Sequence, residues 1–207
     1  MDPIVAAVLV LGMVGGVGAW VVLDARKRKA ATLSLIAPLS ERGWNLAVRG
    51  DQVVAGLTSA PFGAGIHRRC EDVIRSSDKR VASFTYRWTT GSGEQKTDHK
   101  KRVTMILGGA KFPKLEIEAG AVPTNAVPTN ARAADERVGQ AVMHPQMMAR
   151  LMEPDLVGRS VFFEKGRIGL VDEAVQLADI VMHTDVSVAV LREIEGLIPD
   201  AVRAEFA

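Results

Sequence analysis

Histidine, cysteine and carboxylate side chains are the residues of this chain that could support catalysis or bind a metal ion. The four histidines, His67, His99, His144 and His183, stand far apart, with no HExxH pattern and no second cysteine to complete a zinc site. Asp179 and His183 have the i,i+4 spacing of two ligands on one helix face. A solvated pair is the more common outcome of that spacing. The sequence therefore predicts no metal site and no cofactor.

The single cysteine, Cys70, is the best candidate for a nucleophile. It follows Arg68 and Arg69, and neighbouring cations favour a reactive thiolate. The competing interpretation is a half-buried cysteine on a strand, which we favour. The chain has no GxSxG elbow, so no other nucleophile stands out. No residue pattern proposes a reaction, so we favour a protein without enzyme activity and keep an enzyme with an unfamiliar site as the third of our functional hypotheses.

Cations are concentrated in residues 60–114, where twelve Lys and Arg stand against five Asp and Glu. Residues 115–207 show the reverse, with eight Lys and Arg against fifteen Asp and Glu, so the net charge of +2 hides two opposed halves. The halves could attract each other, or the basic section could face a membrane or a polyanion. Lys100, Lys101 and Arg102 are the candidate polyanion contact, because phosphate binding needs clustered cations.

Aromatic residues near those cations decide between nucleic acid and lipid. Phe84, Tyr86 and Trp88 alternate with polar residues, so they share one face of a strand and are expected in the core. Binding of single-stranded nucleic acid uses exposed aromatic rings. We therefore disfavour nucleic acid, and expect anionic lipid to be the partner of the basic section.

Alternating segments predict that the cations lie on a β-sheet. The expected strands are 44–49, 67–75, 80–90, 96–107 and 114–118, followed by a hairpin of 159–164 and 167–171. Their short connections favour an antiparallel meander over βαβ units. The predicted fold class is α+β: an N-terminal transmembrane helix, then an antiparallel β-meander domain covered by a C-terminal helix.

Helices are expected around this sheet. Residues 30–43 should form a continuous helix or a helix interrupted at Pro38, with Gly43 at its end, and another helix should begin at His144 with proline in its first turn. Asp172 is the expected N-cap of the last helix, whose apolar stripe covers the sheet. The sequence does not decide whether residues 131–143 form a helix or a strand. The tandem Ala-Val-Pro-Thr-Asn copies at 121–130 predict a mobile surface loop.

Residues 4–23 are twenty in number and carry no charged side chain. As a helix they would reach about 30 Å, the thickness of a bilayer's hydrocarbon core. A cleaved signal peptide would carry its cations before the apolar run, whereas here they follow it. The glycines of the run lack the preceding strand that a phosphate loop requires. A buried core helix would usually be shorter. We expect a membrane span.

The orientation of that span follows from its basic flank. Arg26, Lys27, Arg28 and Lys29 should stay in the cytoplasm and face anionic lipid, with the N-terminus outside. The expected domains are a transmembrane anchor at 1–29 and a single cytoplasmic domain at 30–207. The lone cysteine agrees with a reducing compartment. Gly12 and Gly16 form a small-xxx-small pair that could dimerise the helix, although glycine is common in membrane helices generally.

Short motifs along the chain are similar to those of a group of uncharacterised actinobacterial proteins. The matching segments are the basic-flanked span, 41–44 (ERGW), 61–63 (PFG), 84–86 (FTY), 90–93 (TGSG) with His99, and 144–148 (HPQMM) with Leu151. The resemblance implies one N-terminal membrane helix and a soluble α+β domain. It implies no catalytic residues, because the group has no assigned activity. The doubled segment at 121–130 departs from the pattern.

These observations lead to three hypotheses. The first is a single-pass membrane protein whose cytoplasmic domain binds a protein partner without catalysis. The second is contact with anionic lipid or nucleic acid through residues 60–114, and the third is the enzyme with an unfamiliar site.

Overall fold

The computed structural model describes residues 30–119 and 131–207. Their helices and strands are α2 (Ile36–Glu41), β1 (Trp44–Arg49), η1 (Asp51–Val54), β2 (Ile66–Ser76), β3 (Val81–Thr90), η2 (Gly93–Gln95), β4 (Thr97–Leu107), β5 (Leu115–Glu118), β6 (Ala131–Ala133), α3 (Glu136–Val142), α4 (Pro145–Leu151), η3 (Pro154–Leu156), β7 (Ser160–Glu164), β8 (Arg167–Glu173), η4 (Leu177–Asp179), α5 (Ile180–Leu197) and α6 (Asp200–Glu205).

The strands of the described residues form one antiparallel sheet in the order β1-β2-β3-β4-β8-β7-β5-β6. The predicted α+β class with an antiparallel sheet and a C-terminal helix is confirmed. The meander is confirmed for β1 to β4 only. The hairpin β7–β8 lies between β4 and β5, because β8 pairs with β4 along the seven residues from Lys101 to Leu107. Residues 131–143 contain both alternatives, since β6 is followed by α3.

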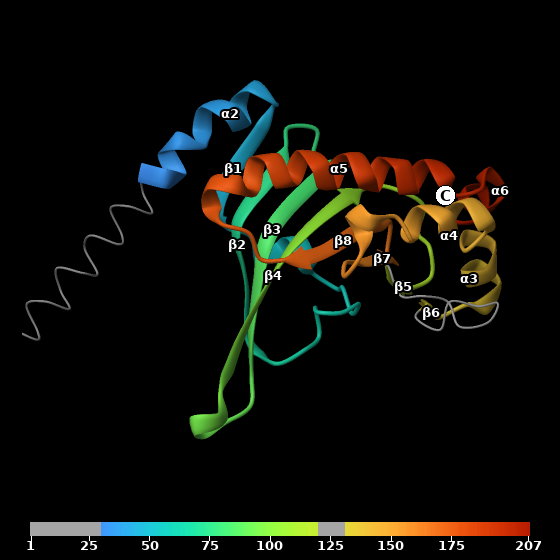
Figure 1. Cartoon of the computed structure of the whole chain (residues 1–207), viewed down its shortest axis with the longest axis horizontal. Helices are drawn as coiled ribbons and strands as arrows, with labels where there is room; N and C mark the ends of the chain where they lie inside the picture. The colour runs from blue at the N-terminus through green and yellow to red at the C-terminus, as the bar shows by residue number, and fades with distance from the viewer. Residues whose placement is uncertain (1–29, 120–130) are drawn as a thin grey trace, which may run out of the picture.

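Both faces of the sheet are covered (Figure 1). Helix α5 lies along one face, and the connection between β1 and β2 packs on the other. In that connection Phe62 contacts the rings of Phe84, Tyr86 and Phe162 at centroid distances of 6.4, 5.1 and 5.5 Å. Phe84 and Tyr86 are therefore core residues, with exposed fractions of 0% and 2%.

Helix α5 rests on two apolar clusters with polar residues between them. Its first residues pack with Leu39 of α2 and Ile74 of β2, and its second half packs with β4, β5, β7 and β8. Between these clusters Thr184 and Ser187 are completely buried. Beyond the helix, β3 and β4 continue as an arm that ends at η2 (Figure 1).

Asp172 does not cap the last helix, which corrects the predicted start of that helix. The residue lies in β8, paired with Arg102 of β4, and α5 begins at Ile180. The ladder with β4 keeps the chain extended through Glu173, where we had expected a helix. Val181, Val188 and Leu191 of α5 are buried, as expected for the apolar stripe of that helix.

Helix boundaries at the two other predicted positions are confirmed. Gly43 follows Arg42, the C-cap residue of α2, and has a φ of +67°, the left-handed conformation of a residue that ends a helix. The alternative of an interruption at Pro38 is wrong, since α2 runs through that residue. His144 is the N-cap residue of α4, with Pro145 in the first turn.

Within residues 30–119 and 131–207, no helix is long and apolar enough to cross a bilayer. The predicted span at 4–23, the basic flank at 26–29 and the glycine pair Gly12 and Gly16 lie outside the described residues, as does the predicted loop at 121–130. The anchor and its orientation therefore stay predictions.

Candidate functional site

The predicted polyanion contact is divided between the two faces of β4. Arg102 is completely buried, Lys101 forms an ion pair with Glu173 of β8, and Lys100 is exposed. Successive strand residues point to opposite faces, so a run of three cations cannot present one charged surface. Arg102 is thus removed from the predicted contact, which stays a prediction for Lys100 and Lys101.

Arg102 instead joins the polar residues beneath α5. Its guanidinium donates to the Asp72 carbonyl at 3.2 Å, to Thr85 Oγ1 at 3.3 Å and to Thr184 Oγ1 at 3.5 Å. Burial lowers the pKa of Arg102 to about 10, although Asp72 acts in the opposite direction. The side chain therefore keeps its charge at neutral pH and holds α5 against β2 and β3.

A row of three exposed cations crosses the sheet where it extends toward the arm. Arg69 of β2 lies opposite Arg87 of β3, which in turn lies opposite Lys100 of β4. We call these three residues the cationic row. Glu71 forms ion pairs with both arginines, with Arg69 Nε at 2.7 Å from one carboxylate oxygen and Arg87 Nε at 2.8 Å from the other. The row lines a pocket of about 470 Å³.

Further residues of this pocket come from the same strands. Trp88 stacks on His99 with ring centroids 5.0 Å apart and planes inclined by 14°. His99 Nε2 lies 2.7 Å from Thr90 Oγ1, and Asp98 accepts a hydrogen bond from Thr89 Oγ1 at 2.8 Å. His67 completes the lining.

Cys70 is not an activated nucleophile. The side chain is completely buried, and burial, followed by the negative charge of Asp51, raises the pKa of its thiol to about 12. A catalytic cysteine requires a thiolate near neutral pH. The structure thus favours the structural interpretation over activation by Arg68 and Arg69.

Ser187, His183 and Asp172 resemble a hydrolase triad but lack a reachable nucleophile. Ser187 Oγ lies 3.4 Å from His183 Nδ1, and His183 Nε2 lies 3.1 Å from Asp172 Oδ2. Ser187 has no exposed surface, and Asp172 also pairs with Arg159 Nε at 2.9 Å. A buried hydroxyl cannot attack a substrate, so the three residues connect α5 to β8. His183 turns toward Asp172, and the solvated pair that we expected with Asp179 is not formed.

Metal-binding clusters of three or more His, Cys, Asp or Glu side chains do not occur in residues 30–119 and 131–207. His144 Nε2 lies 2.7 Å from the Leu197 carbonyl oxygen and so joins α4 to the end of α5.

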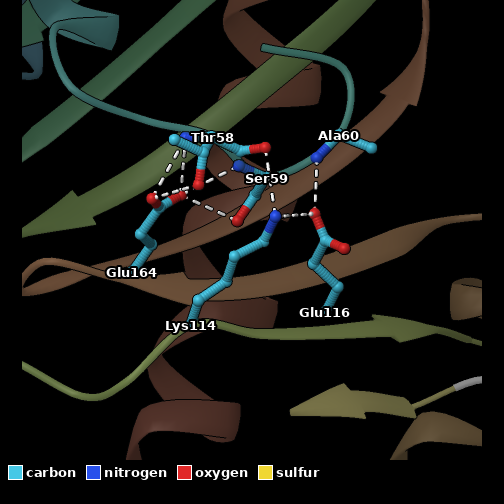
Figure 2. A network of polar contacts seen from close by, with 6 residues as sticks. All are labelled: Thr58, Ser59, Ala60, Lys114, Glu116 and Glu164. Atoms are coloured by element: carbon cyan, nitrogen blue, oxygen red, sulfur yellow. Dashed lines mark hydrogen bonds and ion pairs between the residues drawn. The ribbon is translucent and has the colours of Figure 1, made fainter. Parts of the chain in front are cut away.

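Two carboxylates hold the connection between β1 and β2 in place (Figure 2). Glu164 of β7 accepts hydrogen bonds of 2.8–3.0 Å from the backbone N–H and hydroxyl groups of Thr58 and Ser59. Glu116 of β5 accepts from the Ala60 N–H at 2.6 Å and pairs with Lys114 at 3.2 Å. We call this network the carboxylate clamp.

The carboxylate clamp is not an acid–base pair. Burial acts to raise the pKa of Glu164, but the hydrogen bonds from Thr58 and Ser59 outweigh it and lower the pKa below its ordinary value. A general acid needs a raised pKa, as in glycosidases, so Glu164 stays an ionised acceptor at neutral pH.

The cationic row and the carboxylate clamp were missed from the sequence because both depend on pairing between distant segments. The alternation of β3 does place Arg87 on a polar face. A regular alignment of β2 with β3 from the turn at 76–79 would have put Trp88 opposite Arg69, and only the register shift between Glu71 and Ile74 brings Arg87 there. Nothing local connects Glu164 to Thr58, which lies 106 residues earlier.

Comparisons with known proteins reveal the fold alone. No protein-family model matches this chain, and no curated protein matches it. Among solved structures, the chain is similar to the mycobacterial trehalose monomycolate transport factor A, TtfA, with a TM-score of 0.55 and 10% sequence identity. The match covers 84% of this chain and 95% of that chain. The two proteins therefore share an α+β architecture over nearly the whole of the compared structure.

Proposed function

We propose that this chain is a membrane-anchored binding protein with a transport-related role and no catalytic activity of its own. The observation that carries this proposal is the shared architecture with a transport factor, which extends over 84% of this chain and 95% of the other. At 10% identity the likeness transfers no residue roles, so the proposal concerns the kind of protein and not its ligand.

The arrangement of reactive side chains supports binding over catalysis. Cys70 and Ser187 are the described residues closest to a nucleophile arrangement, and both are completely buried. The carboxylates of the clamp are occupied by hydrogen bonds from residues 58–60. These contacts stabilise the fold, and the Glu116 oxygen that lines a neighbouring pocket has no second carboxylate of the clamp beside it in that lining.

The anchor is the apolar stretch 4–23, with the basic flank at 26–29 on the cytoplasmic side and the domain behind it in the cytoplasm. Membrane lipid and a protein partner are the expected contacts. The glycine pair adds a homodimer through the membrane helix. Replacing Gly12 and Gly16 with Ile should abolish self-association in a membrane two-hybrid assay, and an unchanged signal would remove the dimer from the proposal.

Complementation of a deletion strain tests the proposed function. Full-length C70A and S187A variants should restore the wild-type phenotype to the deletion strain, because neither residue performs chemistry. A chain lacking residues 4–23 should fail. Loss of complementation by C70A or S187A, with the variant present at the wild-type level in membranes, would indicate an enzyme. Site-specific photocross-linking from exposed positions of the complementing protein would then identify the partner.

A second candidate function is contact with anionic lipid through residues 60–114, and the cationic row favours it. Phe84 and Tyr86 are buried, so the aromatic rings that single-stranded nucleic acid would need are not available. The fragment 30–207, once circular dichroism has established its folding, should float with anionic vesicles in a salt-sensitive manner. Failure to float at low salt would eliminate this candidate.

A further inference from the structure

We propose that the cationic row binds a phosphate group, either free or as part of a lipid headgroup. Arg69, Arg87 and Lys100 are direct cross-strand neighbours on three adjacent strands. Like charges placed directly opposite each other destabilise a sheet. An anion bound across the row would remove this repulsion. The row therefore favours the protein with a bound anion over the free protein.

Glu71 organises the row without neutralising it. One carboxylate accepts Nε of both arginines, at 2.7 and 2.8 Å. These contacts fix the two guanidinium groups, and the arginine side chains still keep exposed fractions of 45% and 40%. Lys100 forms no ion pair with any residue that the structure describes. Three cations thus share one orienting carboxylate.

The remaining charge of the pocket sets the class of ligand. The row carries three positive charges, and the carboxylates of Glu71 and Asp98 beside it carry two negative charges. With the histidines counted as neutral, one positive charge is left over. Two guanidinium groups and one ammonium group can contact several oxygens of one phosphate, and arginine binds phosphate through paired hydrogen bonds. A phosphate monoester offers three terminal oxygens against the two of a carboxylate, so each of the three cations can meet an oxygen of its own.

Beside the row, the pocket also has room for the organic part of a phosphate ester. Its volume of about 470 Å³ lies within the range of small-molecule sites. Trp88 and His99 alternate with Arg87 and Lys100 along β3 and β4, so their stacked rings lie on the opposite face of the two strands from the row. Glu71 holds the two guanidinium groups of the row in position before any ligand arrives, which lowers the entropy that binding costs.

Calorimetric titration of the full-length protein in neutral detergent micelles tests this site. The free probes are inorganic phosphate and glycerol 3-phosphate, with glycerol as the neutral control. The lipid probe is short-chain phosphatidic acid in the same micelles, with diacylglycerol as the neutral control. Binding of a free probe, of the lipid probe or of both supports the site, and the pattern identifies the source of the phosphate.

Variants assign the binding to the row. R69Q and R87Q should each raise Kd by about tenfold or more, because each substitution removes hydrogen bonds to the charged phosphate. D98N should tighten binding. K96Q removes a cation from the arm outside the pocket and should leave Kd unchanged. Circular dichroism would verify that R69Q and R87Q are folded.

Two results would overturn the site: no heat of binding with either source of phosphate, or the same Kd for wild type and folded R87Q. The complementation experiment does not depend on this titration, so a failure here leaves the proposed function standing.

Discussion

Glu164 shows what a buried carboxylate does in this fold. It is 4% exposed, and it accepts hydrogen bonds from two consecutive residues of the connection that covers the sheet. Backbone N–H groups that would otherwise lack partners are thereby satisfied. The hydrogen bonds stabilise the ionised form, so the same contacts make the stability of the fold depend on pH.

Acidification should therefore remove a stabilising contribution of Glu164. Its folded pKa is lowered from the ordinary value of 4.5. The contribution is fully present above that value and is lost as the pH falls through the lower folded pKa. At neutral pH E164Q should cost about 2–3 kcal/mol. When thermal unfolding is measured from neutral to acidic pH, the melting temperature should fall less for E164Q than for wild type.

A matched substitution in the same network provides the control. The Glu116 side chain is 21% exposed, so E116Q should change both stability and its pH dependence less than E164Q does. Parallel pH profiles for E164Q and wild type would contradict the role given to Glu164.

Gly169 is required by the ring of Phe162. The two residues are cross-strand partners, and a Cβ at position 169 would lie 2.2 Å from the Phe162 ring. G169A should therefore destabilise the protein by about 1–3 kcal/mol through overpacking. G196A, near the end of α5 where a Cβ meets no neighbour within 4 Å, should stabilise it by about 0.5–1 kcal/mol. Chemical denaturation measures both, and equal effects would contradict the packing argument.

At the scale of elements, the attachment of α5 to the sheet depends on polar contacts as well as apolar ones. Arg159 and His183 both contact Asp172, and Arg102 and Thr184 meet beneath the helix. Breaking a buried ion pair leaves an uncompensated charge, whereas an exposed pair contributes little. Asp172 and Glu173 are adjacent on β8 and represent the buried and the exposed ion pair, so substituting each in turn compares the two.

D172N should lower the free energy of unfolding by about 2–4 kcal/mol, less than for a wholly buried pair because the Arg159 side chain is 24% exposed. E173Q is the control one residue away. Its side chain is 83% exposed, and its loss should change stability by no more than about 0.5 kcal/mol. Urea unfolding of both variants gives the comparison, and a D172N effect as small as that of E173Q would refute the attachment.

Local patterns in the sequence predicted most of the elements, because alternation and helix ends are local properties. The strand at 80–90, the helix end at Gly43 and the helix start at His144 all follow from neighbouring residues. The position of the hairpin β7–β8 between β4 and β5 could not be predicted, since it depends on which strands pair across the chain.

The polar residues near the start of β3 are buried, although they lie on the opposite face of the strand from Phe84 and Tyr86. Ser83 and Thr85 are 0% and 7% exposed, because α5 covers the face that they share. Ser83 Oγ lies 2.9 Å from Thr104 Oγ1 and accepts from Thr184 Oγ1 at 3.1 Å, so these hydroxyls satisfy one another inside the protein. A strand with one polar face can thus be buried on both faces when the covering helix is also polar there.

At the scale of the whole molecule, the membrane anchor proposed at 4–23 would determine where the domain operates. Such an anchor would restrict the cationic row to a layer close to anionic headgroups. The buried state of Cys70 and Ser187 agrees with the binding role proposed above.

Alkaline carbonate extraction of membranes from cells that produce the full-length chain is the most direct measurement. The chain should remain in the membrane pellet, and a variant lacking residues 4–23 should appear in the soluble fraction. Release of the full-length chain into the carbonate supernatant would contradict the account.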